Sequence, residues 1–571
     1  MTAVLGIIVL FFLLVLVCSW PLGSYVAAVI EDPDEIRWIR PLRAIERVFS
    51  SRLKGFYLLE MSWKEYFFAL LTFVSVGFFV LFTLLRWQAI WFFFDPHAVN
   101  MPSDTAFNTA ISFVTNTNWQ SSIPEIELST YVQMMGITTQ QFFSACTGMA
   151  LLCAFARGLR NKENTKIGNF WRDVVRFSVY VLFPLSLFVS FLLVAAGVPQ
   201  SASGSVEYQT MEGMETELPM GMVASQVAIK QLGTNGGGLF RANSAHPLEN
   251  PTPVSNVLEL VSILLLPLAL CRTFAELVKA PRQGILIVSV MAVLFIGGAF
   301  LACYAESSPI PFLPKQERSF FEAEGNMEGK ETRFGPFWSV LWSVATTAVS
   351  NGSTNSSISS FLPLAGGVPM GMIQLGEVLF GGIGTGIVGA VVYLLLAVFS
   401  AGLMVGRTPE YLGKKIEAKE MKLVILLAIL PSALVLTSCA LTIMQPVGRA
   451  TLSSHGPHGI TETLYAFSSS AANNGSSFQG LQANIPLYNF LLGALMYLGR
   501  LFSAALILAL AGTLAEKKKV AVGAGTLPTE TVSFGVWFGF VTLLVGALNF
   551  LPAFTLGPVL EHVMLFFPIH R

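Results

Sequence analysis

Four short strings of amide, hydroxyl and glycine residues interrupt an otherwise apolar chain. They read VTNTNWQ, KQLGTNGGGLF, VSNGSTN and AANNGSS. Each string has a central asparagine, and the separations between these asparagines are 119, 116 and 123 residues. Near-equal spacing of similar strings indicates a fourfold internal repeat. The central residues are Asn116, Asn235, Asn351 and Asn474.

These residue types supply oxygen ligands and a permissive backbone. Oxygen-only ligation suits an alkali cation, whereas zinc and copper prefer imidazole or thiolate. A ring of backbone carbonyls can replace the hydration shell of a monovalent cation. We expect Gly236, Gly352 and Gly475 to let carbonyls turn toward a common axis, because glycine adopts dihedrals that other residues do not. Additional hydroxyl ligands are expected from Thr115, Thr117, Thr234 and Ser350.

Simpler explanations exist for a single string. Asn-Gly is a common hairpin turn signal, and Asn351-Gly352-Ser353 and Asn474-Gly475-Ser476 are formal glycosylation sequons. A phosphate loop is excluded because no string has the lysine context of a P-loop. Neither the turn nor the sequon explains four copies at near-equal spacing, so the pattern favours the lining of a pore.

The composition identifies the elements that must position these loops. The chain has 571 residues, of which 53% are hydrophobic and 12% charged, about half the charged fraction of soluble proteins. Lys+Arg and Asp+Glu both total 34, and we expect no nucleic-acid partner. Six cysteines lie mostly in apolar runs without metal-ligand spacing. The sequence therefore predicts an integral membrane protein.

Ten apolar stretches are long enough to cross a bilayer. They cover residues 3–30, 66–94, 130–156, 174–198, 253–271, 284–303, 370–405, 422–443, 487–515 and 532–555. Four half-polar stretches are too short to span and suit re-entrant helices. They are Asp104–Val114, Met222–Gly233, Phe337–Val349 and Ile460–Ala472.

The distribution of basic residues predicts the orientation. If the N-terminus is outside, the inside loops hold 24 of the 34 Lys and Arg residues. An outside loop instead carries only acidic charges, at Glu207, Glu212, Glu215 and Glu217. Because cytoplasmic loops are enriched in Lys and Arg, we expect both termini and all four strings on the extracytoplasmic side.

The expected fold is an all-α integral membrane protein with four pore repeats around one axis. Each repeat has a span, a re-entrant helix, a polar loop and a returning span. The helix C-termini, which are partially negative, would point at the loops and favour a cation. The repeats are expected at residues 60–158, 172–280, 283–408 and 421–516, with extra helices at 1–30 and 530–571.

The four strings, taken in order, resemble the filter loops of the potassium-binding A subunits of Kdp potassium-transporting P-type ATPases, within the potassium-transporter superfamily. The resemblance covers essentially the whole chain, and it implies that Gln120 and Gly236 affect potassium affinity and selectivity. The strings differ from the TVGYG string of tetrameric potassium channels, so a shorter stack of carbonyl sites is expected. The resemblance assigns the filter to Thr115, Asn116, Thr117, Asn118, Gln120, Thr234, Asn235, Gly236, Gly237, Gly238, Ser350, Asn351, Gly352, Ser353, Asn473, Asn474, Gly475 and Ser476.

Two further features concern the path below the filter. Arg500 lies inside an apolar span, where a charge indicates a functional site, although an arginine near a helix end can also snorkel. The resemblance implies that it is a positive plug. The string LGEVLFGGIGTGIVGA indicates either a broken helix or close helix packing, and the resemblance implies an intramembrane gating loop. Its glycines include Gly381, Gly382, Gly384 and Gly386.

The chain lacks the parts of an ATP-hydrolysing enzyme. None of its five aspartates begins an Asp-Lys-Thr-Gly phosphorylation motif, and no GxxxxGK[ST] loop is present. We therefore expect an ion-binding subunit that transports potassium and binds no ATP. The resemblance implies a complex, in a bacterial inner membrane, with membrane lipids, a catalytic P-type ATPase subunit and two small single-span subunits.

Two other functions remain open. A Trk/Ktr-type potassium uptake channel would share the fourfold filter, but the two extra terminal helices count against it. A secondary transporter with broken helices usually shows two related halves rather than four copies.

Lys230, four residues before Thr234, would repel potassium if it faced the pore, so we expect it to pack behind the filter against an acidic residue.

Overall fold

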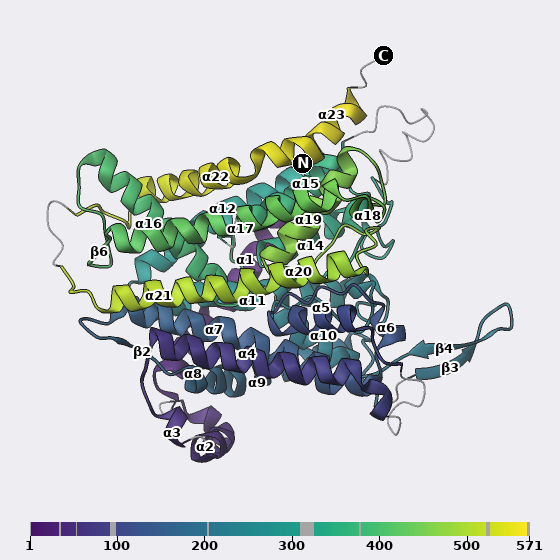
Figure 1. Ribbon diagram of the computed structural model, residues 1–571, viewed down its shortest axis with the longest axis horizontal. Coiled ribbons are helices and arrows are strands. Elements are labelled where there is room, and N and C mark those ends of the chain that lie inside the picture. Colours follow the sequence, from purple (N-terminus) through teal and green to yellow (C-terminus); the bar gives the residue numbers. More distant parts are fainter. Residues whose placement is uncertain are drawn as a thin grey trace.

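Within the residues that the structure describes, ten long apolar helices form one bundle in the computed structural model (Figure 1). The described residues are 2–33, 36–52, 54–91, 99–202, 205–308, 325–375, 378–520 and 526–567. The prediction of an all-α multi-pass membrane protein with ten spans is confirmed. The spans are Thr2–Glu31 (α1), Trp63–Arg86 (α4), Val132–Arg160 (with α7, Thr139–Arg160), Phe170–Ala195 (α8, Phe170–Phe177, and α9, Phe183–Ala195), Pro253–Leu277 (α11), Pro281–Glu306 (α12), Thr385–Val405 (α16), Ala418–Met444 (α17), Pro486–Ala515 (α20, Pro486–Tyr497, and α21, Ser503–Ala515) and Val532–Phe566 (α22, Val532–Phe554, and α23, Leu560–Phe566).

Local sequence signals set the ends of several spans. α4 begins with a capping box, in which the Ser62 N–H donates to Glu65 Oε2 at 2.6 Å and the Ser62 hydroxyl accepts from the Glu65 N–H. α11 has Thr252 as its N-cap and Pro253 at its first position. α16 ends at Val405 and is followed by Gly406, whose φ of 70° is a left-handed C-cap conformation.

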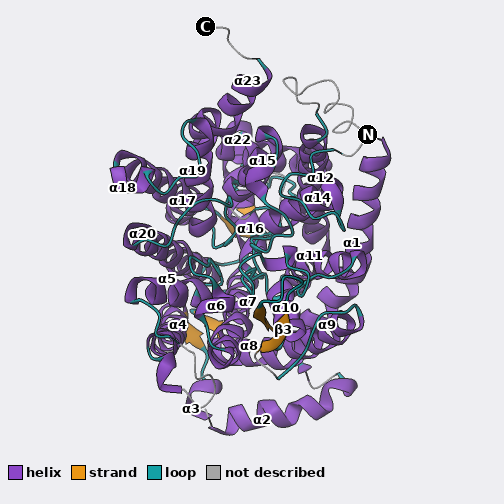
Figure 2. Cartoon of the chain, turned by 90° about the vertical axis from the view of Figure 1, so that its right-hand side faces the viewer, coloured by secondary structure: helices purple, strands orange, loops and turns teal. Residues whose placement is uncertain are grey.

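Four short helices follow spans of the bundle and are largely buried. Their residues match the stretches that the sequence predicts to be too short to span, within three residues at each end. Seen from the end of the bundle, loops gather near its centre (Figure 2). The short helices are Ser103–Val114 (α5), Val223–Leu232 (α10), Gly335–Ala348 (α14) and Pro457–Ala471 (α19).

The predicted span at 370–405 is interrupted. α15 covers Pro363–Gln374, and α16 begins only at Thr385. The chain before α16 turns back so closely that only glycine fits at position 386, where a Cβ would lie 1.6 Å from the Phe380 carbonyl oxygen. Of the two alternatives that the glycine-rich stretch left open, a broken helix and close helix packing, the structure has the break.

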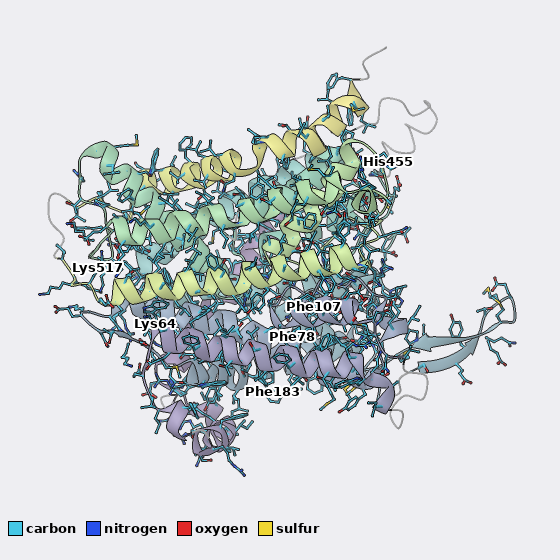
Figure 3. All side chains as sticks on the ribbon, in the orientation of Figure 1. Lys64, Phe78, Phe107, Phe183, His455 and Lys517 are labelled. Atoms are coloured by element: carbon cyan, nitrogen blue, oxygen red, sulfur yellow. The ribbon has the colours of Figure 1, made fainter. Side chains whose placement is uncertain are left out.

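The remaining short helices and strands lie at the two ends of the bundle. Lys64 and Lys517 lie at the end opposite the projecting β3–β4 hairpin (Figure 3). The small elements are the antiparallel pairs β1–β2 (Met61–Ser62, Lys166–Gly168), β3–β4 (Ser205–Gln209, Glu215–Pro219) and β5–β6 (Glu410–Tyr411, Lys414–Lys415), and the helices α2 (Arg43–Arg52), α3 (Lys54–Tyr57), α6 (Pro124–Glu127) and α18 (Pro446–Arg449).

Candidate functional site

The four polar loops begin in the same way, directly after the C-termini of α5, α10, α14 and α19. In each loop one backbone N–H donates to the carbonyl five residues earlier, at 2.8 or 2.9 Å. This bond satisfies a carbonyl at the end of the short helix and turns the chain sharply. The donors are Thr117, Asn235, Asn351 and Asn474.

This hydrogen bond changes which residue of the first loop is equivalent to the central asparagines of the other three. The sequence aligns Asn116 with Asn235, but Thr117 makes the hydrogen bond that corresponds to that of Asn235. The backbone agrees, because positive φ values occur at Asn116 and Asn118, as they do at Thr234 and Gly236. The alignment was wrong by one residue because Thr-Asn-Thr-Asn offers two asparagines and no glycine as a marker.

The loops follow one another around a common axis. A Cβ placed on Gly236 would lie 2.2 Å from the carbonyl oxygen of Asn351, and one on Gly352 would lie 2.0 Å from that of Asn474. Gly475 stands in the same relation to Thr117, again at 2.0 Å. Each glycine thus lets its loop press against the backbone of the next. In the first loop the equivalent residue is an asparagine, the residue that best tolerates this conformation after glycine.

The carbonyl oxygens in the middle of the loops form a candidate cation ring. Among the described residues none donates a hydrogen bond to them, and the four residues are 0% exposed. A buried carbonyl without a partner costs about 1–3 kcal/mol, so such groups are rare outside functional sites. A cation would satisfy all four. The oxygens belong to Thr117, Asn235, Asn351 and Asn474.

Side chains of the loops are mostly used to tie neighbouring loops together. Asn116 Nδ2 donates to the Thr234 carbonyl at 3.0 Å, and the Ser350 hydroxyl donates to the Ala472 carbonyl at 2.7 Å. Asn473 Nδ2 donates to Thr117 Oγ1 at 2.8 Å. Backbone carbonyls are therefore better placed than hydroxyls to act as the principal ligands.

The predicted hydroxyl ligands all have protein partners. The Thr115 hydroxyl donates to the Ile111 carbonyl at 2.8 Å, and Thr115 itself is the C-cap of α5 rather than a loop residue. Thr234 Oγ1 accepts from the backbone N–H of Ile383 at 3.2 Å. These hydroxyls position the backbone, and their role as ligands stays a prediction.

Gln120 joins two of the loops. Its Nε2 donates to the Gly238 carbonyl at 2.9 Å, and its Oε1 accepts from the Gly238 N–H at 3.2 Å. The amide therefore pairs with the backbone of the second loop in the manner of a neighbouring strand. The neighbouring Gly237 carbonyl accepts from Gln141 Nε2 at 2.6 Å. Gln120 thus has a structural reason to affect the ring without touching an ion.

A cavity of about 560 Å³ opens on one side of the loops. It is lined by residues of all four, among them Asn118, Gly237, Gly352 and Gly475. Asn118 is 2% exposed, and both polar atoms of its side chain have no partner among the described residues. This arrangement is that of a polar vestibule in front of a narrow ring.

On the other side of the ring, the predicted plug and the break between α15 and α16 come together. Arg500 is 7% exposed, and its Nη2 donates to Thr147 Oγ1 at 3.2 Å. A Cβ on Gly148 would lie 2.1 Å from the Ile383 carbonyl oxygen and 3.0 Å from Arg500 Nη2. A Cβ on Gly384 would lie 2.2 Å from the Gly148 carbonyl oxygen. Arg500 is thus buried in the bundle and does not snorkel.

The other glycines of this segment also have close neighbours. The Gly381 N–H donates to the carbonyl of Ala348, at the end of α14, at 3.0 Å. A Cβ on Gly382 would lie 3.0 Å from Thr385 Oγ1 and 3.8 Å from Thr234 Oγ1. The segment between α15 and α16 therefore packs directly beneath the loops.

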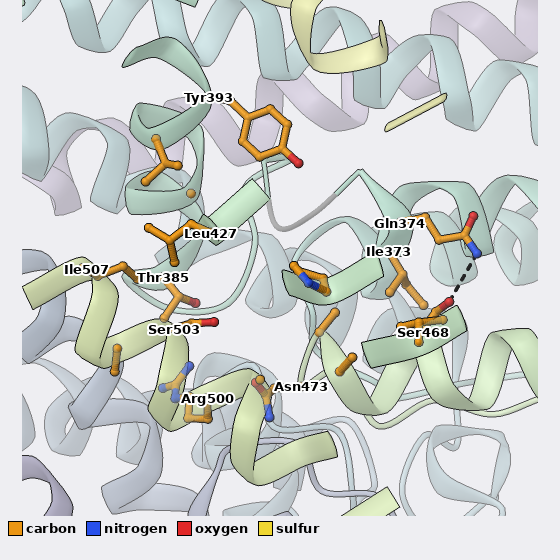
Figure 4. A pocket seen from close by; sticks show the side chains of 18 of the residues that line it. Ile373, Gln374, Thr385, Tyr393, Leu427, Ser468, Asn473, Arg500, Ser503 and Ile507 are labelled. Atoms are coloured by element: carbon orange, nitrogen blue, oxygen red, sulfur yellow. Dashed lines mark hydrogen bonds between the residues drawn. The ribbon is translucent and has the colours of Figure 1, made fainter. Parts of the chain in front are cut away.

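A cavity of about 90 Å³ adjoins Arg500 (Figure 4). Asn473 of the fourth loop lines it, and so do Thr385, Gln374 and Ser468. Gln374 Nε2 donates to Ser468 Oγ at 3.2 Å. The cavity therefore begins at the loops and has polar groups along its wall.

Lys230 packs behind the second loop, and the structure identifies its acidic partner as Glu249. Lys230 Nζ and Glu249 Oε2 form an ion pair whose side chains are 0% and 1% exposed. Sequence reasoning did not identify Glu249 or Asn243, which lie in the polar segment NSAHPLENPTP with no recognisable motif. Beside them, burial lowers the pKa of His246, whose ring stacks on Phe240.

Comparisons with known proteins show the family of the chain. The family model "KdpA: Potassium-transporting ATPase A subunit" matches residues 9–563. A potassium-transporting ATPase potassium-binding subunit of Herpetosiphon aurantiacus is 47% identical, over 97% of this chain and 98% of its own length. One of Sorangium cellulosum is 48% identical, over 95% and 96%.

Among solved structures, the chain is similar to the potassium transporter TrkH from Vibrio parahaemolyticus. The TM-score is 0.48 and the identity 15%, over 73% of this chain and 80% of that one. The sequence matches, by contrast, run along nearly the whole chain and at high identity. The chain therefore belongs to the KdpA family, the A subunits of potassium-transporting ATPases.

Proposed function

We propose that the chain is the potassium-binding subunit of a potassium-transporting ATPase complex in a bacterial inner membrane. The observation that carries the proposal is the ring of four buried carbonyls, one from each loop, to which no residue in the described part of the chain donates a hydrogen bond. Carbonyl dipoles of this kind replace the hydration shell of potassium. Because the chain belongs to the KdpA family, the proposed ion is potassium and the proposed complex is a potassium-transporting ATPase.

In this proposal potassium enters from the extracytoplasmic vestibule and leaves the ring sideways. The smaller cavity runs from Asn473 to Leu427 on α17 and Phe550 on α22, which are outer helices of the bundle. Arg500 and the segment around Gly384 lie across the direct route through the bundle. A catalytic P-type ATPase subunit and two small single-span subunits complete the complex, and this chain binds no ATP.

Uptake of rubidium tests the proposal. Cells without other potassium transporters would express this chain alone or together with the ATPase partners. Uptake only with the partners is expected for an ion-binding subunit of a pump. Uptake by the chain alone would contradict the proposal and support a Trk/Ktr-type channel instead.

Exchange of Gln120 is expected to weaken potassium binding. In Gln120→Arg the side chain cannot accept a hydrogen bond from the Gly238 N–H, and a positive charge would lie at the rim of the vestibule. Loss of one such hydrogen bond costs about 1 kcal/mol, so affinity should fall by at least about fivefold. Potassium-stimulated ATP hydrolysis of the complex measures the change. An unchanged apparent affinity and unchanged rubidium discrimination in Gln120→Arg and in Gly236→Ser would contradict the filter assignment.

The corrected alignment of the first loop predicts an asymmetric pair of variants at Asn118. Asn118→Gly should retain potassium affinity within a few fold, because glycine occupies the equivalent position in the other three loops. Asn118→Val should lose at least about tenfold, since a β-branched residue at a φ of 58° is strongly disfavoured. Potassium titrations of both complexes provide the comparison. Equal effects of the two substitutions would show that Asn118 acts through its amide and not through its backbone.

A further inference from the structure

The second loop differs from the other three in how its carbonyls are used. Asn243 Nδ2 donates to the Gly236 carbonyl at 2.6 Å. The equivalent carbonyls of Asn118, Gly352 and Gly475 accept no hydrogen bond from any residue in the described part of the chain. At this level of the filter, therefore, three carbonyls are free to face an ion and the fourth is held by a side chain.

The direction of the Asn243 amide is set by a buried ion pair. Lys230 Nζ donates to Asn243 Oδ1 at 2.8 Å and contacts Glu249 Oε2. An ammonium group can only donate hydrogen bonds, so it must face the amide oxygen. The Ser244 N–H donates to the same oxygen at 3.0 Å. The amide nitrogen is consequently left to face Gly236.

Glu249 holds Lys230 in place and also contacts the backbone of the loop. Its Oε1 accepts from the Phe240 N–H at 3.3 Å. A Cβ on Gly238 would lie 2.6 Å from this oxygen and 3.3 Å from Lys230 Nζ. The ion pair therefore lies directly against the back of the loop.

We propose that Lys230 and Glu249 are positioning residues for cation selectivity, acting through the Asn243 amide on the Gly236 carbonyl. The inference rests on the proposed potassium filter. By holding this carbonyl away from the axis, the pair leaves three oxygens at the outer level and four at the level of Asn235. Selectivity depends on the number and orientation of carbonyl dipoles around the ion. Removing the pair would free the fourth carbonyl and alter the discrimination between cations.

Lys230→Met in the complete complex tests the proposal. Apparent affinities for potassium, rubidium and sodium would be measured from cation-stimulated ATP hydrolysis, and independently from the rise in Tm that each cation causes. We expect the ratio of potassium to rubidium affinity to change by about tenfold. Glu249→Gln, which keeps the shape and a hydrogen bond, should change the ratio in the same direction but less.

A second buried pair offers a matched control. Lys330 Nζ and Glu306 Oε1 are 2.7 Å apart, their side chains are 0% and 2% exposed, and Asn326 Nδ2 donates to the same carboxylate oxygen. In the described part of the chain, this pair makes no contact with the residues of the candidate cation ring. Lys330→Met should lower the Tm of the complex as Lys230→Met does, but leave the affinity ratios unchanged.

Asn243→Leu distinguishes a positioning role from a general loss of stability. It frees the Gly236 carbonyl while the ion pair remains, so it should reproduce the altered ratio of Lys230→Met. Because both act through one link, the double variant should be no more altered than either single variant. Asn243→Leu also tests the inference if the complex with Lys230→Met fails to assemble.

The outcomes separate the inference from the proposed function. Unaltered affinity ratios in Lys230→Met or Asn243→Leu, with potassium still bound by the unmodified complex, would overturn the inference alone. Additive changes in the double variant would overturn it as well. Absence of any potassium-dependent Tm shift in the unmodified complex would overturn the filter, and with it this inference.

Discussion

Gly352→Ala is expected to abolish high-affinity potassium binding. The added Cβ would lie 2.0 Å from the Asn474 carbonyl oxygen, which belongs to the proposed ring. The φ of 95° at this residue is also unfavourable for alanine, by about 1–2 kcal/mol or roughly tenfold in affinity before the steric overlap is counted. Because the overlap pushes the carbonyl itself, we expect a loss of at least about a hundredfold in apparent affinity. Potassium titration of ATP hydrolysis measures it.

Gly297→Ala is the matched control. Gly297 lies within α12, and a Cβ on it would have no atom of the described residues within 4 Å. The substitution makes the same chemical change at an exposed position far from the loops in sequence, so it should leave the apparent potassium affinity unaltered. A similar loss in both variants would mean that Gly352→Ala acts through folding, whereas no loss in either would remove Gly352 from the filter.

Arg500→Met is expected to create a potassium leak. A unit charge about 5 Å from the ion path costs a cation roughly 3 kcal/mol at an effective dielectric constant of 20, which corresponds to about a hundredfold in rate. Without the guanidinium, the direct route through the bundle would no longer carry a positive charge that repels potassium. Passive rubidium flux into vesicles that contain the complex, measured without ATP, should therefore rise by about that factor.

Arg500→Lys tests whether the charge is responsible. It keeps the positive charge and should keep the passive flux low. If Arg500→Lys leaks as much as Arg500→Met, the guanidinium contributes through its shape and its contact with Thr147. If neither variant leaks, Arg500 is not a plug, and the segment around Gly384 alone would have to close the path.

The sequence predicted the helices and the loops because both depend on local patterns. Apolar runs of bilayer length gave the spans, and the short helices differ from their predicted bounds by at most three residues. The first loop was misaligned because its glycine position is filled by Asn118, and only the backbone shows the equivalence. The glycines before α16 left a helix break and close helix packing both open, and only the structure shows the break and the packing of Gly384 against Gly148.

The supporting residues behind the loops could not be found in the same way. Asn243 and Glu249 follow the second loop in the sequence, and the chain folds back so that Asn243 contacts Gly236 and Glu249 contacts Lys230. The spacing of residues in their segment does not indicate these contacts. Lys230 was expected to pair with an acid, because a buried ammonium needs one, but several acidic residues were possible. Such pairings depend on tertiary packing, which no periodic pattern encodes.

The most direct measurement locates the ion itself. Crystals or frozen grids of the complex with rubidium or thallium would give anomalous or difference density for the bound cation. We predict a peak enclosed by the carbonyls of Thr117, Asn235, Asn351 and Asn474, which weakens when potassium is added in excess. A saturable peak elsewhere in the chain, with none between the four loops, would contradict this prediction.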